Sequence, residues 1–335
     1  MPKQRGKKES QKPPRHHHYI PSFFLEGFTA SGSKDDYLFV LDIKQKKMWR
    51  AKSENAAHQR DFYRVKIPGV EPNLVEKTFG HFENQAAFVI KKIIKKRELP
   101  EDDDFIVLIN FVALMAVRIP RYRSVFDGSL EKMNKFRLKL MTAHPKRWAA
   151  IRERMKKNGY DIDDKVSYEA MKGFVERDNY SIKVSQEWHI KNLLDSMDIL
   201  IPLLVGRKWS LFIVQNDNDE FICSDSPVAL EWTKPVPPFW GPGFGMKYTE
   251  LTMPLNKHIA ILGSFEEEPQ TFRAPKTTVA KLNSRTIMYA QRFIYSSVPN
   301  IIWFKGKGEI GNTRDLMIIT KAKNKNANSK KNQKT

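Results

Sequence analysis

Three consecutive histidines, His16, His17 and His18, stand near the N-terminus of the chain. Imidazole gives and takes protons near neutral pH and also binds metal ions. Adjacent side chains cannot all point the same way, so at most two of the three can share one site. A cluster of surface histidines with no common task is the alternative, and the run by itself does not separate the two interpretations.

Two carboxylates follow in a segment whose apolar residues recur at spacings of three and four, which predicts an amphipathic helix. Glu76 and Glu83 are separated by two helical turns and therefore lie on the same flank of this helix. Ile90 and Ile94 share that flank. A carboxylate beside apolar side chains needs a cationic or metal partner. Without such a partner, the two glutamates only mark the edge of the apolar stripe.

Arg118 stands near the end of an apolar stretch, residues 105–119, that predicts a buried helix. A guanidinium group stays charged in proteins, so its burial requires a carboxylate or phosphate partner. A pair with Glu83 is a structural role, whereas contact with a substrate phosphate is a functional one. The structural role is favoured, because most buried arginines are paired within the protein.

The fourth candidate is Asp225, in a polar turn directly after the expected strand 220–223. Rigid strand ends often carry catalytic residues, and this carboxylate could bind a metal ion or orient a histidine. The alternative is an Asx turn that simply ends the strand, which its serine and proline neighbours also favour. The P-loop, GxSxG and HExxH motifs are absent from the sequence, and the glycine-rich segment 241–245 has no strand before it, so it does not fit a dinucleotide-binding loop.

The elements that must position these residues follow the order strands, helices, strands. We expect one α+β domain over residues 16–320, with 16–70 mainly β, 71–205 helical and 206–315 mainly β. The expected strand segments are a hairpin of 37–41 with 47–50, a short strand at 61–65, a hairpin of 209–214 with 220–223, and a pair at 251–255 and 258–262. The expected helical features are a break at His144-Pro145, a cap at Ser185 and one late helix, 277–292.

The net charge of +20 favours a polyanionic partner, but its distribution matters. Residues 1–15 contribute +5 and residues 321–335 contribute +6, so the two tails together carry +11 of the +20. Both tails are rich in lysine and poor in apolar residues, which predicts disorder. Such tails bind polyanions such as nucleic acid, or only keep the protein in solution, and the two interpretations have equal weight.

The cysteine count and the apolar stretches indicate the compartment. Cys223 is the single cysteine, which excludes an intrachain disulfide and a CxxC zinc site. No apolar segment follows the basic N-terminus, as a signal peptide would require. The most apolar stretch is shorter than the roughly 20 residues of a membrane-spanning helix. The sequence therefore predicts a cytoplasmic protein without a membrane partner.

Several short motifs along the chain match those of a known family. In order along the chain, the motifs that match are His17-His18-Tyr19-Ile20-Pro21, Phe23-Phe24-Leu25, Phe28, Phe62-Tyr63, Glu76, Glu83, Val117-Arg118-Ile119-Pro120-Arg121, Phe221-Ile222-Cys223-Ser224-Asp225-Ser226-Pro227-Val228, Met253-Pro254-Leu255-Asn256, Asn283 and Arg292-Phe293-Ile294-Tyr295. Over about residues 16 to 300 the chain resembles the bacterial domain-of-unknown-function family DUF4238. The resemblance implies a bacterial cytoplasmic protein and supplies no reaction.

The matching polar residues suggest phosphoryl chemistry, and we hypothesise a metal-dependent nuclease or phosphodiesterase acting on nucleic acid. His17 or His18 would be the base or a metal ligand, and Arg118 would contact phosphate. Mg²⁺ or Mn²⁺ would be held by His18, Glu83 and Asp225. The main alternative is a non-catalytic nucleic-acid-binding or regulatory module in which the same residues form a structural network. An enzyme acting on a small phosphorylated molecule is a third candidate and would require a closed pocket.

Overall fold

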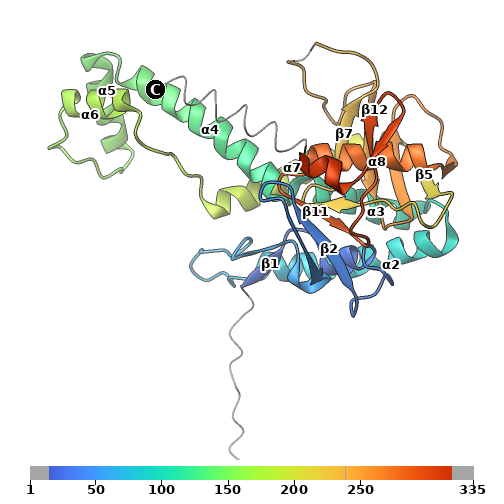
Figure 1. Ribbon diagram of the computed structural model, residues 1–335. Helices are drawn as coiled ribbons and strands as arrows, with labels where there is room; N and C mark the ends of the chain where they lie inside the picture. Colours follow the sequence, from blue (N-terminus) through green and yellow to red (C-terminus); the bar gives the residue numbers. More distant parts are fainter. Residues whose placement is uncertain (1–14, 238, 319–335) are drawn as a thin grey trace, which may run out of the picture. The chain divides into compact units, whose positions relative to one another are not determined.

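The computed structural model describes residues 15–237 and 239–318 (Figure 1). The expected disorder of the tails falls outside these residues, apart from Arg15. By their contacts the residues group into two compact units, one formed by Met1–Pro120 with Ile190–Thr335 and the other by Arg121–His189. The single domain expected over 16–320 therefore stays a prediction.

The predicted α+β class is confirmed, with strands at both ends of the described chain and helices between them. The helices are α1 (Ser22–Glu26), the 3₁₀ helix η1 (Ser53–Asn55), α2 (Leu74–Lys96), α3 (Asp102–Val117), α4 (Pro120–Met141), α5 (Pro145–Lys157), α6 (Tyr168–Arg177), α7 (Gln186–Val205) and α8 (Lys276–Tyr289). The strands are β1 (His16–His18), β2 (Tyr37–Asp42), β3 (Lys47–Lys52), β4 (His58–Arg60), β5 (Lys208–Val214), β6 (Cys223–Ser224), β7 (Ala229–Trp232), β8 (Thr249–Pro254), β9 (Ile259–Ser264), β10 (Thr271–Ala274), β11 (Phe293–Ser296), β12 (Trp303–Gly306) and β13 (Glu309–Gly311).

Helices α2 and α3 pack together and support the N-terminal segment. The stripe of α2 that the spacing predicts is buried at Phe79, Ala86, Val89 and Ile93. Helix α3 begins with three aspartates, whose charge favours a helix N-terminus, and is buried on most of its surface after its second turn. Both helices therefore form where the apolar pattern places them.

Two sheets make up most of the rest of the first unit. Strands β2 and β3 form the predicted hairpin and extend into a four-stranded sheet of order β3-β2-β11-β6. The other sheet has the order β10-β5-β9-β8-β7 and is antiparallel except for β10, which runs parallel to β5. Helix α8 packs against this sheet (Figure 1), where Val279 and Leu282 bury against Val214, Phe221 and Ala260.

Two strand predictions are wrong. The segments 209–214 and 220–223 do not form a hairpin, because β5 pairs with β9 and β10, whereas β6 pairs with β11 in the other sheet. The polar residues between them do form a turn, in which the Asp219 N–H donates to the Asn216 carbonyl. The strand after this turn, however, belongs to a different sheet from the strand before it. The short strand expected at 61–65 is a turn, and the strand β4 comes just before it.

The helical predictions for the second unit are confirmed. Helix α4 ends at Met141 and α5 begins at Pro145, which gives the expected break. The hydroxyl of Ser185 accepts the Trp188 N–H at 3.1 Å, so Ser185 caps α7 as its residue type predicts. None of the described helices is by itself long and apolar enough to span a membrane, although α3 and α4 taken together have that length and composition.

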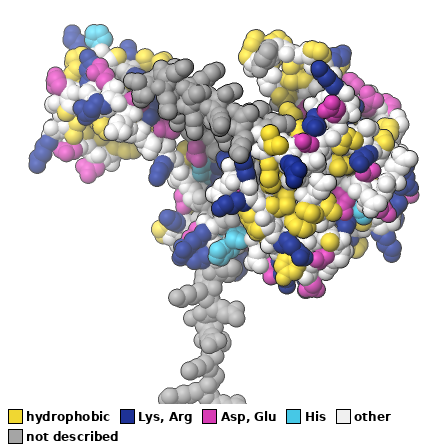
Figure 2. Space-filling view, viewed as in Figure 1, with side chains coloured by type: hydrophobic (Ala, Val, Ile, Leu, Met, Phe, Trp, Pro, Cys, Tyr) yellow, Lys and Arg dark blue, Asp and Glu magenta, His cyan; other side chains and the backbone are white. Residues whose placement is uncertain are grey.

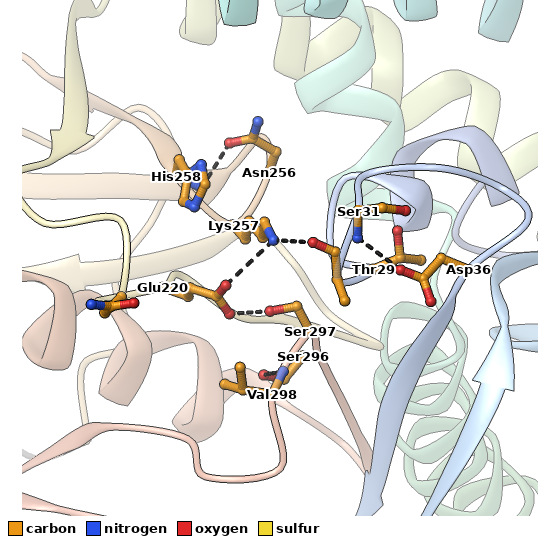
Figure 3. A network of polar contacts seen from close by, with 12 residues as sticks. Thr29, Ser31, Asp36, Glu220, Asn256, Lys257, His258, Ser296, Ser297 and Val298 are labelled. Carbon is orange, nitrogen blue, oxygen red and sulfur yellow. Dashed lines mark hydrogen bonds and ion pairs between the residues drawn. The ribbon is translucent and has the colours of Figure 1, made fainter.

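A polar cluster fastens the segment after α1 to the strands of the first unit (Figure 3). The ammonium of Lys257 lies 2.5 Å from the Ala30 carbonyl and 3.5 Å from Glu220 Oε1, and the Ser297 hydroxyl donates to the other oxygen of Glu220. The Lys257 and Glu220 side chains are only 16% and 10% exposed. Loss of either charge therefore leaves the other almost buried without its partner.

We expect Lys257→Met to lower the free energy of unfolding by about 2 kcal/mol, because Glu220 and the Ala30 carbonyl would each lose a donor. Lys208→Met is the matched control. Its partner Glu268 is 72% exposed, so the change there should be below about 0.5 kcal/mol. Denaturant unfolding followed by circular dichroism measures both. An equal loss in the two variants would show that the cluster is no stronger than a surface pair.

Candidate functional site

Arg118 lies at the centre of the candidate site. Its side chain is fully buried at the C-terminal end of α3. Its Nη1 donates to Glu83 Oε1 at 2.7 Å and its Nη2 donates to the His18 carbonyl at 2.6 Å. The Tyr63 hydroxyl lies 3.4 Å from its Nε. The sequence left open a structural pair with Glu83 or contact with a substrate phosphate, and the structure contains the pair with Glu83.

Two aromatic rings complete the environment of this guanidinium. Its central carbon lies 5.6 Å from the centroid of Tyr63 and 5.0 Å from that of Phe79, within the range of cation–π attraction. The Tyr63 hydroxyl also donates to the Arg118 carbonyl at 2.8 Å. Neither ring was a candidate from the sequence. The Phe62-Tyr63 match to the family was the one signal that could have found Tyr63.

Strand geometry separates the histidines of β1. Successive side chains point to opposite faces of a strand, and His17 is the one that points inward, where it is fully buried. Its Nδ1 accepts the Tyr63 N–H at 2.8 Å, and its ring stacks on Tyr63 with a centroid distance of 6.0 Å. The contacts of His17 therefore hold the turn that carries Tyr63.

His18 points to the other face and remains partly exposed. Its Nε2 lies 3.0 Å from the Glu54 carbonyl. A carbonyl oxygen only accepts, so Nε2 carries the hydrogen, and in the neutral ring the lone pair is on Nδ1. Burial lowers the pKa of His18, and the positive charges of His58 and Arg118 lower it further, against the effect of the Glu54 carbonyl. The neutral imidazole is thus the favoured form.

Glu76 and Glu83 lie on the same flank of α2, as the spacing predicts, but their environments differ. Glu83 pairs with Arg118. Glu76 is half-buried, and no described residue supplies a hydrogen bond to its Oε2. Burial raises the pKa of Glu76 to about 7, and the nearby charge of Glu83 adds to the effect, whereas Arg118 and the His18 backbone oppose it. Glu83 is therefore bound in an ion pair, whereas Glu76 has a pKa near neutral pH.

Asp225 belongs to a different set of contacts. Its two oxygens accept the backbone N–H groups of Gln291, Arg292 and Phe293 at 2.7, 2.8 and 2.9 Å. Burial raises the pKa of Asp225, and the three N–H groups oppose the shift. These bonds fix the start of β11. The alternative considered from the sequence, an Asx turn, would only have ended the preceding strand.

Tyr19 connects the two sets of contacts. It follows His18 in the chain, and its hydroxyl lies 3.3 Å from that of Tyr295 in β11. Burial raises the pKa of Tyr19, and the negative charge of Asp225 also raises it. Four predicted site residues, His17, His18, Glu83 and Arg118, therefore meet through direct contacts or through Tyr63. Asp225 lies in the neighbouring network that Tyr19 joins to them.

The residues expected to bind Mg²⁺ or Mn²⁺ do not form a ligand set. Among the described residues, no group of three or more His, Cys, Asp or Glu side chains is arranged to hold a metal ion. Glu83 is engaged by Arg118, and Asp225 by three backbone amides. Metal binding by His18, Glu83 and Asp225 stays a prediction, and no chemical step below depends on it.

The raised pKa of Glu76 predicts how stability depends on pH. The folded state binds the proton of Glu76 more tightly than the unfolded state, so ionisation of Glu76 destabilises the fold as the pH rises from 4.5 to about 7. Glu76→Gln removes this effect. We expect the variant to gain about 1–2 kcal/mol over the wild type at pH 8 and almost nothing at pH 5. Melting temperatures at both pH values measure the difference, and an equal gain at both would contradict the assignment.

No curated protein and no solved structure matches the chain. A family model described as a protein of unknown function, DUF4238, matches residues 16–299, a span that includes all five predicted site residues. The match covers most of the 335 residues and confirms the resemblance found in the motifs. The chain belongs to the DUF4238 family.

Proposed function

We propose that this protein hydrolyses phosphodiester bonds in nucleic acid. The observation that supports the proposal is that Arg118 of α3 binds Glu83 of α2 and the backbone carbonyl of His18 in β1, with Glu76 close enough for both charges to act on it. His18, Glu76 and Glu83 are each partly open to solvent. A half-buried carboxyl group and a partly exposed imidazole are groups that acid–base hydrolysis uses.

Each residue has a distinct task in this proposal. His18 Nδ1 takes the proton from the attacking water or from a ribose 2′-hydroxyl. Glu76 gives a proton to the leaving oxygen, for which a group that is partly protonated at neutral pH is suited. Arg118 is too deeply buried to touch a substrate, so it holds Glu83 and the His18 backbone in place. Arg118 is a positioning residue here, whereas the sequence alone suggested a phosphate contact.

The charge of the chain supports a polyanionic substrate. The net charge is +20, and electrostatic attraction to phosphate groups supplies most non-specific affinity for nucleic acid. On the face in Figure 2, Lys and Arg side chains are spread among acidic ones and do not gather in one patch. The basic tails are therefore expected to provide part of the attraction. A bacterial source, a cytoplasmic location and dependence on Mg²⁺ or Mn²⁺ remain predictions.

The test is cleavage of labelled single-stranded and duplex RNA and DNA, with Mg²⁺, with Mn²⁺ and with chelator. We expect the wild type to cleave at least one substrate, and His18→Gln and Glu76→Gln to be at least 100-fold slower, a typical loss for an acid–base group. His81→Gln, at an exposed position of α2, is the control and should keep full activity. An inert wild type under all these conditions would overturn the proposal.

A non-catalytic nucleic-acid-binding or regulatory module is the second candidate. It is favoured by the complete engagement of Arg118 and Asp225, whose bonds go to the protein itself. In that case Asp225→Asn should lower the melting temperature strongly. The amide nitrogen that replaces one carboxylate oxygen cannot accept the backbone N–H bonds that this oxygen now accepts. Binding of labelled RNA and DNA by a wild type that does not cleave either would support this candidate over the hydrolase.

A further inference from the structure

The sheet formed by β1 and β4 carries three histidines on one face. His16 and His18 are two residues apart in β1 and so point the same way, opposite to His17. His58 in β4 lies directly across from His18 in the antiparallel register and therefore shares their face. Figure 2 shows histidine side chains at the surface near the position of β1, beside Lys and Arg side chains.

Two of these imidazoles have the spacing of metal ligands. Nδ1 of His16 lies 3.1 Å from Nδ1 of His58, a hydrogen bond in which one of the two nitrogens carries the hydrogen, and the ring centroids are 4.8 Å apart. In a tetrahedral zinc site with Zn–N bonds of 2.0–2.1 Å, two ligand nitrogens lie about 3.3 Å apart. If the hydrogen between them moves to Nε2 of its own ring, a small tilt of the two rings lets both Nδ1 lone pairs reach one ion. The ring of His18 lies next to this pair, 5.5 Å from His58.

We propose that His16 and His58 bind a divalent transition-metal ion of the zinc class through their Nδ1 atoms, with solvent in the remaining positions. Imidazole nitrogen prefers Zn²⁺, Cu²⁺ and Ni²⁺, whereas Mg²⁺ prefers oxygen ligands. The site is distinct from the Mg²⁺ or Mn²⁺ site expected at His18, Glu83 and Asp225. It has two protein ligands and so does not need a third side chain in place. It also does not depend on the proposed hydrolysis.

The strands hold the pair in place. Asp61, directly after β4, accepts from the Arg15 guanidinium, and its backbone N–H donates to the Arg15 carbonyl at 2.7 Å. The same carboxylate lies 3.7 Å from Arg60 and 3.8 Å from Arg64. This bond network fixes the end of the sheet beside His16 and offsets part of the positive charge that would repel a cation.

Titration calorimetry of the full chain with Zn²⁺ and with Mg²⁺ tests the proposal. We expect one Zn²⁺ per chain for the wild type, at least tenfold weaker binding for His16→Gln and for His58→Gln, and loss of the site in the double variant. His81→Gln is the control and should bind like the wild type. Mg²⁺ at the same concentration should not displace the bound Zn²⁺. Equal Zn²⁺ affinity in the double variant, or displacement of the Zn²⁺ by Mg²⁺ at the same concentration, would overturn the site.

A second measurement uses the wild type alone and so does not depend on the folding of a variant. Nitrogen-15 NMR of the eight histidine rings follows each imidazole during addition of Zn²⁺. The Nδ1 signals of His16 and His58 should shift or broaden first, because a directly bound metal changes the nitrogen that carries it. First changes at the other histidines would refute the assignment.

Discussion

Burial of the Arg118 guanidinium is the constraint on which the candidate site depends. Removing such a charge from water costs several kcal/mol, and the cost is offset only if the surrounding groups satisfy it. Here the partners come from three other segments: the His18 carbonyl in β1, the Tyr63 hydroxyl after β4, and the Glu83 carboxylate in α2. The buried charge therefore specifies how the N-terminal strands sit on the two helices.

The polar groups around that charge have different environments. Glu83 reaches Nη1 of Arg118, whereas Glu76, two turns earlier on the same flank, has no described partner for its Oε2, and burial raises its pKa. Two like carboxylates in one low-dielectric site cannot both ionise freely. Burial of Glu76 beside a structural ion pair thus gives two neighbouring carboxyl groups different properties, which is how acid and base roles become separated in many enzymes.

The hydrogen bonds of Asp225 play the same part in the C-terminal half of the chain as the contacts of Arg118 do in the N-terminal half. Its carboxylate orders the backbone at the start of β11, and β11 pairs with β2 from the N-terminal hairpin. The contact between the Tyr19 and Tyr295 hydroxyls then links this region to the segment of the histidines. The N-terminal hairpin and the late strand β11 therefore belong to one sheet. A change at one network is expected to reach the other through β11 and Tyr19.

The sequence determined the local features, because they depend on residues close together in the chain. The apolar spacing of α2, the first hairpin, the break at Pro145 and the common flank of Glu76 and Glu83 all follow from side-chain period and backbone preference. The tertiary structure decided the rest. A turn signal at 216–219 cannot tell whether the next strand joins the same sheet, and no local pattern indicates that Tyr63 closes over Arg118 or that His58 faces His16. Those contacts join residues far apart in the chain. They form because distant apolar surfaces are buried together, and no short segment encodes which surfaces meet.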